Sequence, residues 1–213
     1  MGVRVSEIRL MERDRKIIRE IDRWRVCQGR HIREVAGFSG QRACDRRLRK
    51  LIEAGYIRRE KILYGVAGIY SNTIKATKRE GLPGNNRKIR VEQIVHDIAV
   101  LDTAIFLNKK HGIEFDTIKT EIELHRQDGF GVRKHRPDFV IARGGKLVCV
   151  EVELTLKAKD RFLKIIAENF IDYDLQIWVV PCMENKIAQI LKENKIPYPN
   201  IRLLKLAEVQ KNG

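Results

Sequence analysis

The first third of the chain has apolar residues at helical spacing, with basic residues between them. Over Asp14–Cys27, isoleucines and Trp24 fall on one face of a predicted helix and arginines fill the other. A short second helix is predicted over His31–Gly37. A third helix follows, for which Ser39 is a favourable N-cap and Gly55 a favourable C-terminal stop. The pattern therefore predicts a basic unit of short helices joined by tight turns.

The third predicted helix has two chemically different faces. Cys44, Leu48 and Leu51 recur at helical spacing and are expected to face the core. The opposite face carries polar residues that can reach the base edges and phosphates of DNA, namely Gln41, Arg42, Asp45, Arg46 and Arg49. This layout is typical of a DNA-recognition helix, although a charged helix face is also typical of plain exposure to solvent.

Two short strands are expected after this helix. Tyr56–Tyr64 alternates apolar and polar residues, Gly65 and Gly68 favour a turn, and Ile69–Thr73 can return as the second strand. A hairpin in this place is the wing of a winged helix-turn-helix domain, and LIEAGYIRRE…GIYSNTIKATKREGL resembles that family. Four basic residues are expected to equip the wing for contact with DNA: Lys61, Lys75, Lys78 and Arg79. Winged domains also mediate protein contacts, which remains the alternative.

The second half of the chain alternates predicted helices and strands. A helical stripe runs from Val91 to Ile105, a strand is predicted over Phe115–Leu124, a polar loop over Gln127–Lys134 and a helix over Lys157–Ile171. The last elements are a strand at Gln176–Pro181, a helix at Glu184–Glu193 and a strand at Ile201–Leu206. Strands that alternate with helices predict an α/β (α+β) fold class with a mixed sheet in this half.

Between the polar loop and the Lys157 helix lies HRPDFVIARGGKLVCVEVELTLK, which contains two strands, a tight turn and several acids. Side chains alternate along a strand, so Glu151 and Glu153 share a face, and the hairpin register can bring Asp138 to the same end. Clustered carboxylates repel and persist mainly where a cation or proton compensates them. A Val-Glu-Val-Glu-Leu run also fits an ordinary half-solvated strand, so both interpretations stay open here.

A Pro-Asp pair ending at Asp138, followed by Glu151-x-Glu153, resembles the active-site layout of PD-(D/E)xK nucleases. The resemblance implies that Asp138 and Glu151 hold Mg²⁺ or Mn²⁺, because hard divalent cations prefer carboxylate oxygens. Glu153 stands where these enzymes usually have a lysine, and Lys157 could reach back to supply the cation. These four residues are the candidate catalytic set, and Glu121 is a weaker candidate for a further metal ligand.

Charge is distributed unevenly along the 213 residues, whose net charge is +15. Residues 1–90 hold 24 Lys and Arg against 10 Asp and Glu, a net of +14, whereas the remaining 19 basic and 18 acidic residues leave +1. A basic first part favours a polyanionic partner, most simply nucleic acid. Pro83–Arg87 would interrupt any helix, so the sequence predicts two domains, residues 1–85 and 86–213.

The sequence also predicts the compartment. No stretch approaches the ~18 consecutive apolar residues of a membrane span, and the N-terminus is too charged for a signal peptide. The cysteines lack C-x-x-C spacing, which argues against a zinc site and a disulfide framework: Cys27, Cys44, Cys149 and Cys182. We expect a reduced, cytoplasmic protein with no membrane partner.

Five short segments in order, from about Asp14 to Pro181, resemble the replication-relaxation family of plasmid and conjugative-element proteins. They are IRRE…IYSNTIKATKREG, VHDIAVLDTAIFL, TEIEL, RPDFVIA and VEVELTLKAKDRF. The resemblance implies an N-terminal winged helix-turn-helix followed by a PD-(D/E)xK-nuclease-like domain. It also implies a role in the replication or transfer of mobile DNA.

Two functional hypotheses follow. In the first, the protein binds double-stranded DNA of a mobile element, and its second domain cuts or nicks DNA with Mg²⁺ or Mn²⁺. In the second, it is a non-catalytic transcription regulator or replication accessory factor with a degenerate nuclease fold, as Glu153 in place of lysine would allow. RNA binding is less favoured because the chain has 7% aromatic residues and no evident stacking platform. Duplex sites are often read by two-fold proteins, so a homodimer is a further hypothesis.

Overall fold

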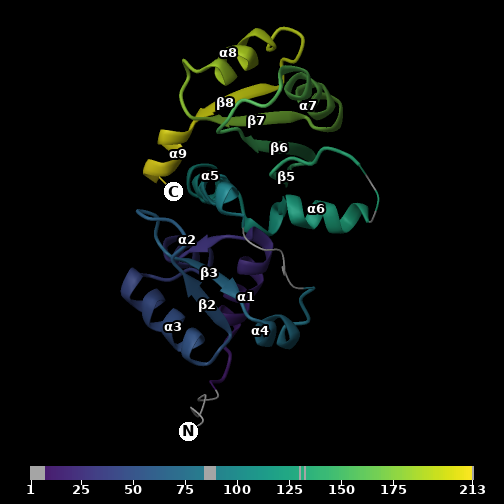
Figure 1. Cartoon of the computed structure of the whole chain (residues 1–213). Helices are drawn as coiled ribbons and strands as arrows, with labels where there is room; N and C mark the ends of the chain where they lie inside the picture. The colour runs from purple at the N-terminus through teal and green to yellow at the C-terminus, as the bar shows by residue number, and fades with distance from the viewer. Residues whose placement is uncertain (1–7, 84–89, 130, 132, 213) are drawn as a thin grey trace. The chain divides into compact units, whose positions relative to one another are not determined.

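The computed structural model describes residues 8–83, 90–129, 131 and 133–212 (Figure 1). The chain divides into two units, Met1–Leu101 and Asp102–Gly213. The boundary between them falls inside helix α5 (Ile94–His111). Most of the predicted linker, residues 84–87, lies outside the described residues.

The N-terminal unit contains short helices and a three-stranded antiparallel sheet of order β1-β3-β2. The elements are α1 (Glu12–Trp24), β1 (Cys27–Gln28), α2 (Gly29–Val35), α3 (Gln41–Glu53), β2 (Ile57–Glu60), β3 (Ile69–Asn72) and α4 (Ile74–Arg79). In α3 the predicted core residues Cys44, Leu48 and Leu51 are buried. The α3 helix stops before Gly55, which has a φ of 72°, as the sequence predicted.

Several predicted boundaries in this unit were wrong by a few residues. The α1 helix ends at Trp24 rather than Cys27, because Arg25 takes a φ of 63° and Cys27 pairs with Tyr70 in the sheet. The N-cap of α3 is Gly40, not Ser39.

The strand predicted over Tyr56–Tyr64 ends at Glu60. The chain that follows it turns inward, so that apolar side chains pack on a buried cluster. The packing residues are Ile62, Leu63 and Val66, and the cluster is Val26, Ile69, Ile94 and Ile98. Burial of this apolar loop outweighs continuation of the strand.

The C-terminal unit is built on a five-stranded mixed sheet of order β4-β5-β6-β7-β8, which confirms the α/β class. The first three strands pair antiparallel, and β6, β7 and β8 run parallel. The elements after α5 are β4 (Ile118–Thr120), α6 (Glu121–Asp128), β5 (Phe139–Arg143), β6 (Lys146–Val152), α7 (Lys159–Asp172), β7 (Leu175–Val180), α8 (Lys186–Glu193), β8 (Ile201–Lys205) and α9 (Leu206–Asn212).

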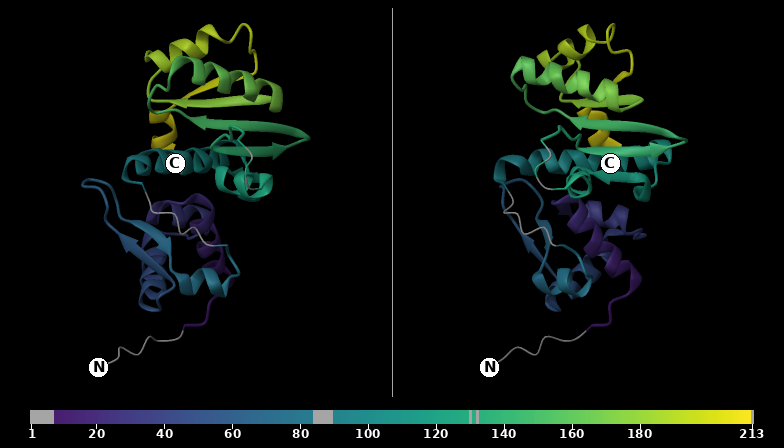
Figure 2. Two further views of the ribbon diagram at one scale, coloured as in Figure 1. Left: turned by 45° about the vertical axis from the view of Figure 1, so that its right-hand side comes forward. Right: turned by 90° about the vertical axis from the view of Figure 1, so that its right-hand side faces the viewer.

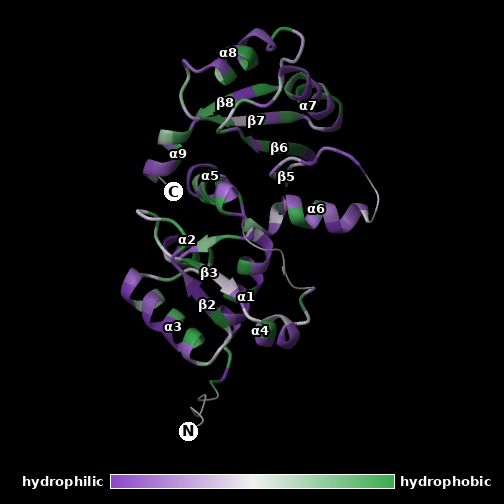
Figure 3. Ribbon diagram, in the orientation of Figure 1, coloured by the Kyte–Doolittle hydropathy of each residue, from purple (hydrophilic) through white to green (hydrophobic). Residues whose placement is uncertain are grey.

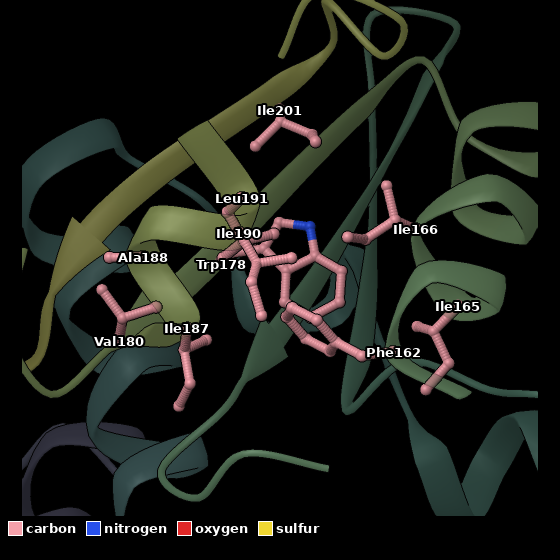
Figure 4. Close-up of a cluster of buried hydrophobic side chains, with 10 residues drawn as sticks. All are labelled: Phe162, Ile165, Ile166, Trp178, Val180, Ile187, Ala188, Ile190, Leu191 and Ile201. Atoms are coloured by element: carbon pink, nitrogen blue, oxygen red, sulfur yellow. The ribbon is translucent and has the colours of Figure 1, made fainter. Parts of the chain in front are cut away.

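One face of this sheet is covered by α7 and α8, which connect the parallel strands (Figure 2). The apolar sides of these helices and strands form a buried core (Figure 4): Phe162, Ile165, Ile166, Trp178, Val180, Ile187, Ala188, Ile190, Leu191 and Ile201. The rings of Phe162 and Trp178 meet edge to face, with centroids 5.2 Å apart. This core packs α7 against β7, the strand that pairs with β6 and its terminal carboxylates.

The strand predicted over Phe115–Leu124 was wrong beyond Thr120, because α6 begins at Glu121. Thr120 and Glu123 form a capping box. Thr120 Oγ1 accepts a hydrogen bond from the Glu123 N–H at 3.3 Å, and Glu123 Oε2 accepts one from the Thr120 N–H at 2.8 Å. The Thr-x-x-Glu signature starts a helix here and overrides the alternation of apolar and polar residues.

Among the described residues, no helix combines the length and apolar character needed to cross a bilayer.

Candidate functional sites

The β5–β6 hairpin brings Asp138 next to Glu151. The register pairs Phe139 with Val150, so Asp138 lies opposite Glu151 at the end of the ladder. The Val152 N–H donates a hydrogen bond to Asp138 Oδ2 at 2.7 Å and holds this carboxylate against β6. Two of the predicted acids, Asp138 and Glu151, therefore lie side by side at one end of the sheet, where β6 ends and the chain continues toward α7.

Glu151 is buried, with 4% of its surface exposed, and two side chains contact one of its oxygens. His135 Nε2 lies 2.6 Å from Glu151 Oε1, and Asn169 Nδ2 donates a hydrogen bond to the same oxygen at 2.9 Å. Burial raises the pKa of Glu151, while the contact with His135 opposes this change. Burial disfavours the His135 cation, but the hydrogen bond and charge of Glu151 raise the pKa of His135 overall.

Glu153 lies one step beyond β6 and is also buried. Its backbone N–H donates a hydrogen bond to the Val179 carbonyl at 2.9 Å. The Lys157 ammonium, from the segment before α7, forms an ion pair with Glu153 Oε2. Burial raises the pKa of Glu153, and the neighbouring Lys157 opposes the change. Lys157, which the sequence suggested could reach back, does contact Glu153.

Glu121 touches this region through its backbone. Its N–H, at the start of α6, donates a hydrogen bond to the Asp138 carbonyl at 2.9 Å. The Glu121 carboxylate lies 3.6 Å from His125 Nε2 on its own helix. In the described part of the chain, no three or more His, Cys, Asp and Glu side chains are arranged as a metal-ligand set.

The sequence did not predict that His135 and Asn169 contact Glu151. Asn169 occupies the apolar face of α7, in helical register with Phe162, Ile165 and Ile166, and all four are buried. A single amide on a buried apolar face needs a polar partner. This position was therefore a usable signal for a side chain directed at β6. No comparable pattern marks His135, which comes next to its partner only through the hairpin.

In the N-terminal unit, α3 presents an exposed basic face. Arg42, Arg46 and Arg49 are exposed, opposite the buried Cys44, Leu48 and Leu51. Figure 3 shows the hydrophilic outer side of α3. Within the described residues, no ion pair of these three arginines is found. Arg47 on the flank differs, because its guanidinium is paired with the buried Asp14 of α1.

The other predicted DNA-binding residues occupy different settings. Gln41 Nε2 donates a hydrogen bond to Asp45 Oδ1 at 2.7 Å along α3. Lys61 is exposed just after β2. Lys75 and Lys78, which the sequence predicted to equip the wing, lie on helix α4 directly after β3. Lys75 Nζ also donates to the Ala54 carbonyl at 2.9 Å, so Lys75 ties the end of α3 to α4.

In comparisons with protein-family profiles, with curated proteins and with solved structures, this chain has no significant match.

Proposed function

We propose that the protein binds double-stranded DNA, and that its N-terminal unit is a winged helix-turn-helix domain with α3 as the recognition helix. The observation that carries this proposal is the basic face of α3 on a unit with the order α1-β1-α2-α3-β2-β3. A helix before a β-hairpin is the element that such domains insert into the major groove. The net charge of +15 supports a polyanionic partner.

The three exposed arginines on α3 have the chemistry that duplex binding needs. A guanidinium can donate two parallel hydrogen bonds to guanine O6 and N7, or bind a backbone phosphate. Arg42, Arg46 and Arg49 would require no ion pair of the described residues to break before they reach DNA. Arg47 is assigned no DNA contact, because its guanidinium stabilises the buried Asp14.

For the C-terminal unit we propose a PD-(D/E)xK-like, metal-dependent endonuclease or nicking activity. Asp138 and Glu151 adjoin at one end of the sheet, and their carboxylate oxygens suit Mg²⁺ or Mn²⁺. When bound, such an ion would activate water and offset the charge that develops on the scissile phosphate. This activity, and the role in a mobile element that the sequence resemblance implies, are parts of the proposal.

The neighbouring side chains have separate roles in this proposal. Asn169 and His135 orient the Glu151 carboxylate by contacting one oxygen. Lys157 replaces the usual lysine in charge though not in sequence position, because its ammonium sits against Glu153. From there Lys157 would bring a positive charge to the phosphate, and Glu153 would hold it in place.

One observation favours the second candidate, a non-catalytic regulator or replication accessory factor. Each of the central acids already has a partner within the chain: Asp138 with the Val152 amide, Glu151 with His135 and Asn169, and Glu153 with Lys157. A carboxylate cluster satisfied in this way can persist without a metal ion.

The test is DNA cleavage measured beside DNA binding. Supercoiled and linear duplexes are incubated with Mg²⁺ or Mn²⁺ and wild-type protein, Asp138→Ala or a control, while binding of a labelled duplex is followed by fluorescence anisotropy. The control is Asp160→Ala, which removes an exposed acid near the start of α7 with the same change of charge.

The proposed nuclease predicts nicking by the wild type and the control, and loss of nicking with intact binding for Asp138→Ala. Binding without cleavage in all three proteins would establish the regulator. Absence of duplex binding by the wild type would refute the proposal for the N-terminal unit.

A further inference from the structure

An acidic side chain interrupts the basic face of α3. Asp45 is exposed and follows Arg42 and precedes Arg46 and Arg49 along the helix. A carboxylate on a surface that meets DNA repels the phosphates and weakens binding to any sequence. Asp45 is therefore unfavourable for binding that depends on phosphate contacts alone, and its presence on this face calls for a specific acceptor role.

The surroundings of Asp45 hold its carboxylate at one edge of α3. Asp45 Oδ1 accepts the hydrogen bond from Gln41 Nε2, one helical turn earlier. A Cβ on Gly29, at the start of α2, would lie 3.9 Å from Asp45 Oδ1, 3.6 Å from Gln41 Nε2 and 3.7 Å from Tyr70 Cε2. The Gln41–Asp45 pair and the Tyr70 ring of β3 thus lie around the side of Gly29 where a larger residue would place its Cβ.

This arrangement leaves an acceptor available. Gln41 binds one carboxylate oxygen, and no further hydrogen bond or ion pair of Asp45 is found in the described residues. In the major groove, the exocyclic N4 amino group of cytosine is a donor that an aspartate can accept from. The same groove edge of guanine offers only acceptors, which a carboxylate would repel.

We infer that Asp45 is a specificity-determining residue that accepts a hydrogen bond from the N4 amino group of cytosine. Gln41 donates to one oxygen of the carboxylate and leaves the other oxygen for this contact, which does not depend on Gln41. The inference rests on the proposed binding of duplex DNA by α3 and goes beyond it, because it assigns the base that one side chain reads. In this inference the neighbouring arginines provide affinity for DNA. Asp45 lowers that affinity and in return distinguishes cytosine from the other bases.

The experiment selects binding sites from a randomised duplex library with the full chain. Wild type, Asp45→Ala, Asp45→Asn and Gln41→Ala are compared, with Glu53→Ala as the control that removes another exposed acid from the same helix. All the altered side chains are exposed, and circular dichroism checks that each variant is folded.

We expect wild type, the control and Gln41→Ala to select cytosine at one position, with a preference of about tenfold or more, the size that one hydrogen bond to a charged group gives. Asp45→Ala should lose this preference and bind non-specific duplex roughly threefold more tightly at low salt, as loss of one charge about 7 Å from a phosphate predicts. Asp45→Asn should exchange cytosine for adenine, which an amide recognises through N6 and N7.

Selection of the same cytosine by Asp45→Ala would overturn the inference. So would its loss in Gln41→Ala, since Asp45 would then act only by holding Gln41. If wild type binds no duplex at all, the proposed function fails and the inference fails with it. Binding with unchanged selection in the Asp45 variants overturns the inference alone.

Discussion

If the exposed arginines of α3 contact DNA phosphates, they set how strongly the binding affinity depends on salt concentration. If Arg42, Arg46 and Arg49 each neutralise one phosphate, replacing all three with alanine removes three released counterions. Each contact contributes about 0.9 to the slope of log K against log salt on B-DNA, so the slope should fall by about 2.7. Between about 50 mM and about 200 mM salt, the wild type should therefore lose about 40-fold more affinity than the variant does.

The assay is fluorescence anisotropy with one labelled duplex over a salt series. The control variant carries alanine at Lys186, Lys195 and Lys211, three exposed lysines of the C-terminal unit, and so has the same net charge. We expect the control to keep the wild-type slope. Equal slopes for the arginine variant and the wild type would refute phosphate contact by α3. Equal reductions in both variants would show that net charge alone determines binding.

Three further predictions concern stability and thiol chemistry. Arg47→Ala should lower the unfolding free energy by about 2–3 kcal/mol in urea denaturation, because Asp14, 1% exposed, loses its charged partner; an unchanged midpoint would contradict this role. Thr120→Ala should cost about 1 kcal/mol by removing the α6 N-cap, and Thr120→Ser should restore most of it. Burial and then the charge of Asp45 raise the pKa of Cys44 to about 11. With a thiol reagent at about pH 8, the partly exposed Cys182 should therefore react before the buried Cys44, whose thiol stays protonated there; equal rates would contradict this environment for Cys44.

Much of the fold could be predicted because its longer elements have strong periodic patterns. The apolar stripe of α3 predicts a helix and identifies the face that is buried. The apolar run QIWVV of β7 likewise predicts a buried strand. Short elements were harder. In α6 the capping pair of Thr120 and Glu123 competes with a strand-like alternation, and the hydrogen bonds of the cap prevail. The α4 and α9 helices, six and seven residues long, were not predicted.

In the candidate carboxylate site, the sequence predicted the acids but not the side chains that contact them. Asp138, Glu151 and Glu153 lie on or directly beside two strands joined by one tight turn, so alternation and turn length suffice to bring them together. Asn169 comes from α7, and its contact depends on how that helix packs on the sheet. Contacts of this kind depend on tertiary packing, which local periodicity does not encode. The hydrogen bond from Lys75 to the Ala54 carbonyl could not be predicted for the same reason.

The two-residue turn of the β5–β6 hairpin determines which changes of strand length keep Asp138 opposite Glu151. Gly144 and Gly145 have φ values of 57° and 75° and close the hairpin between the paired Arg143 and Lys146. Adding or removing one residue on either strand would shift the ladder by one step and turn Glu151 to the opposite face from Asp138. An odd change of length in one strand therefore places the two acids on opposite faces of the sheet. An even change keeps them on one face but moves them apart along the ladder, by about 3.3 Å per residue. The two acids stay opposite each other only when both strands change by the same length.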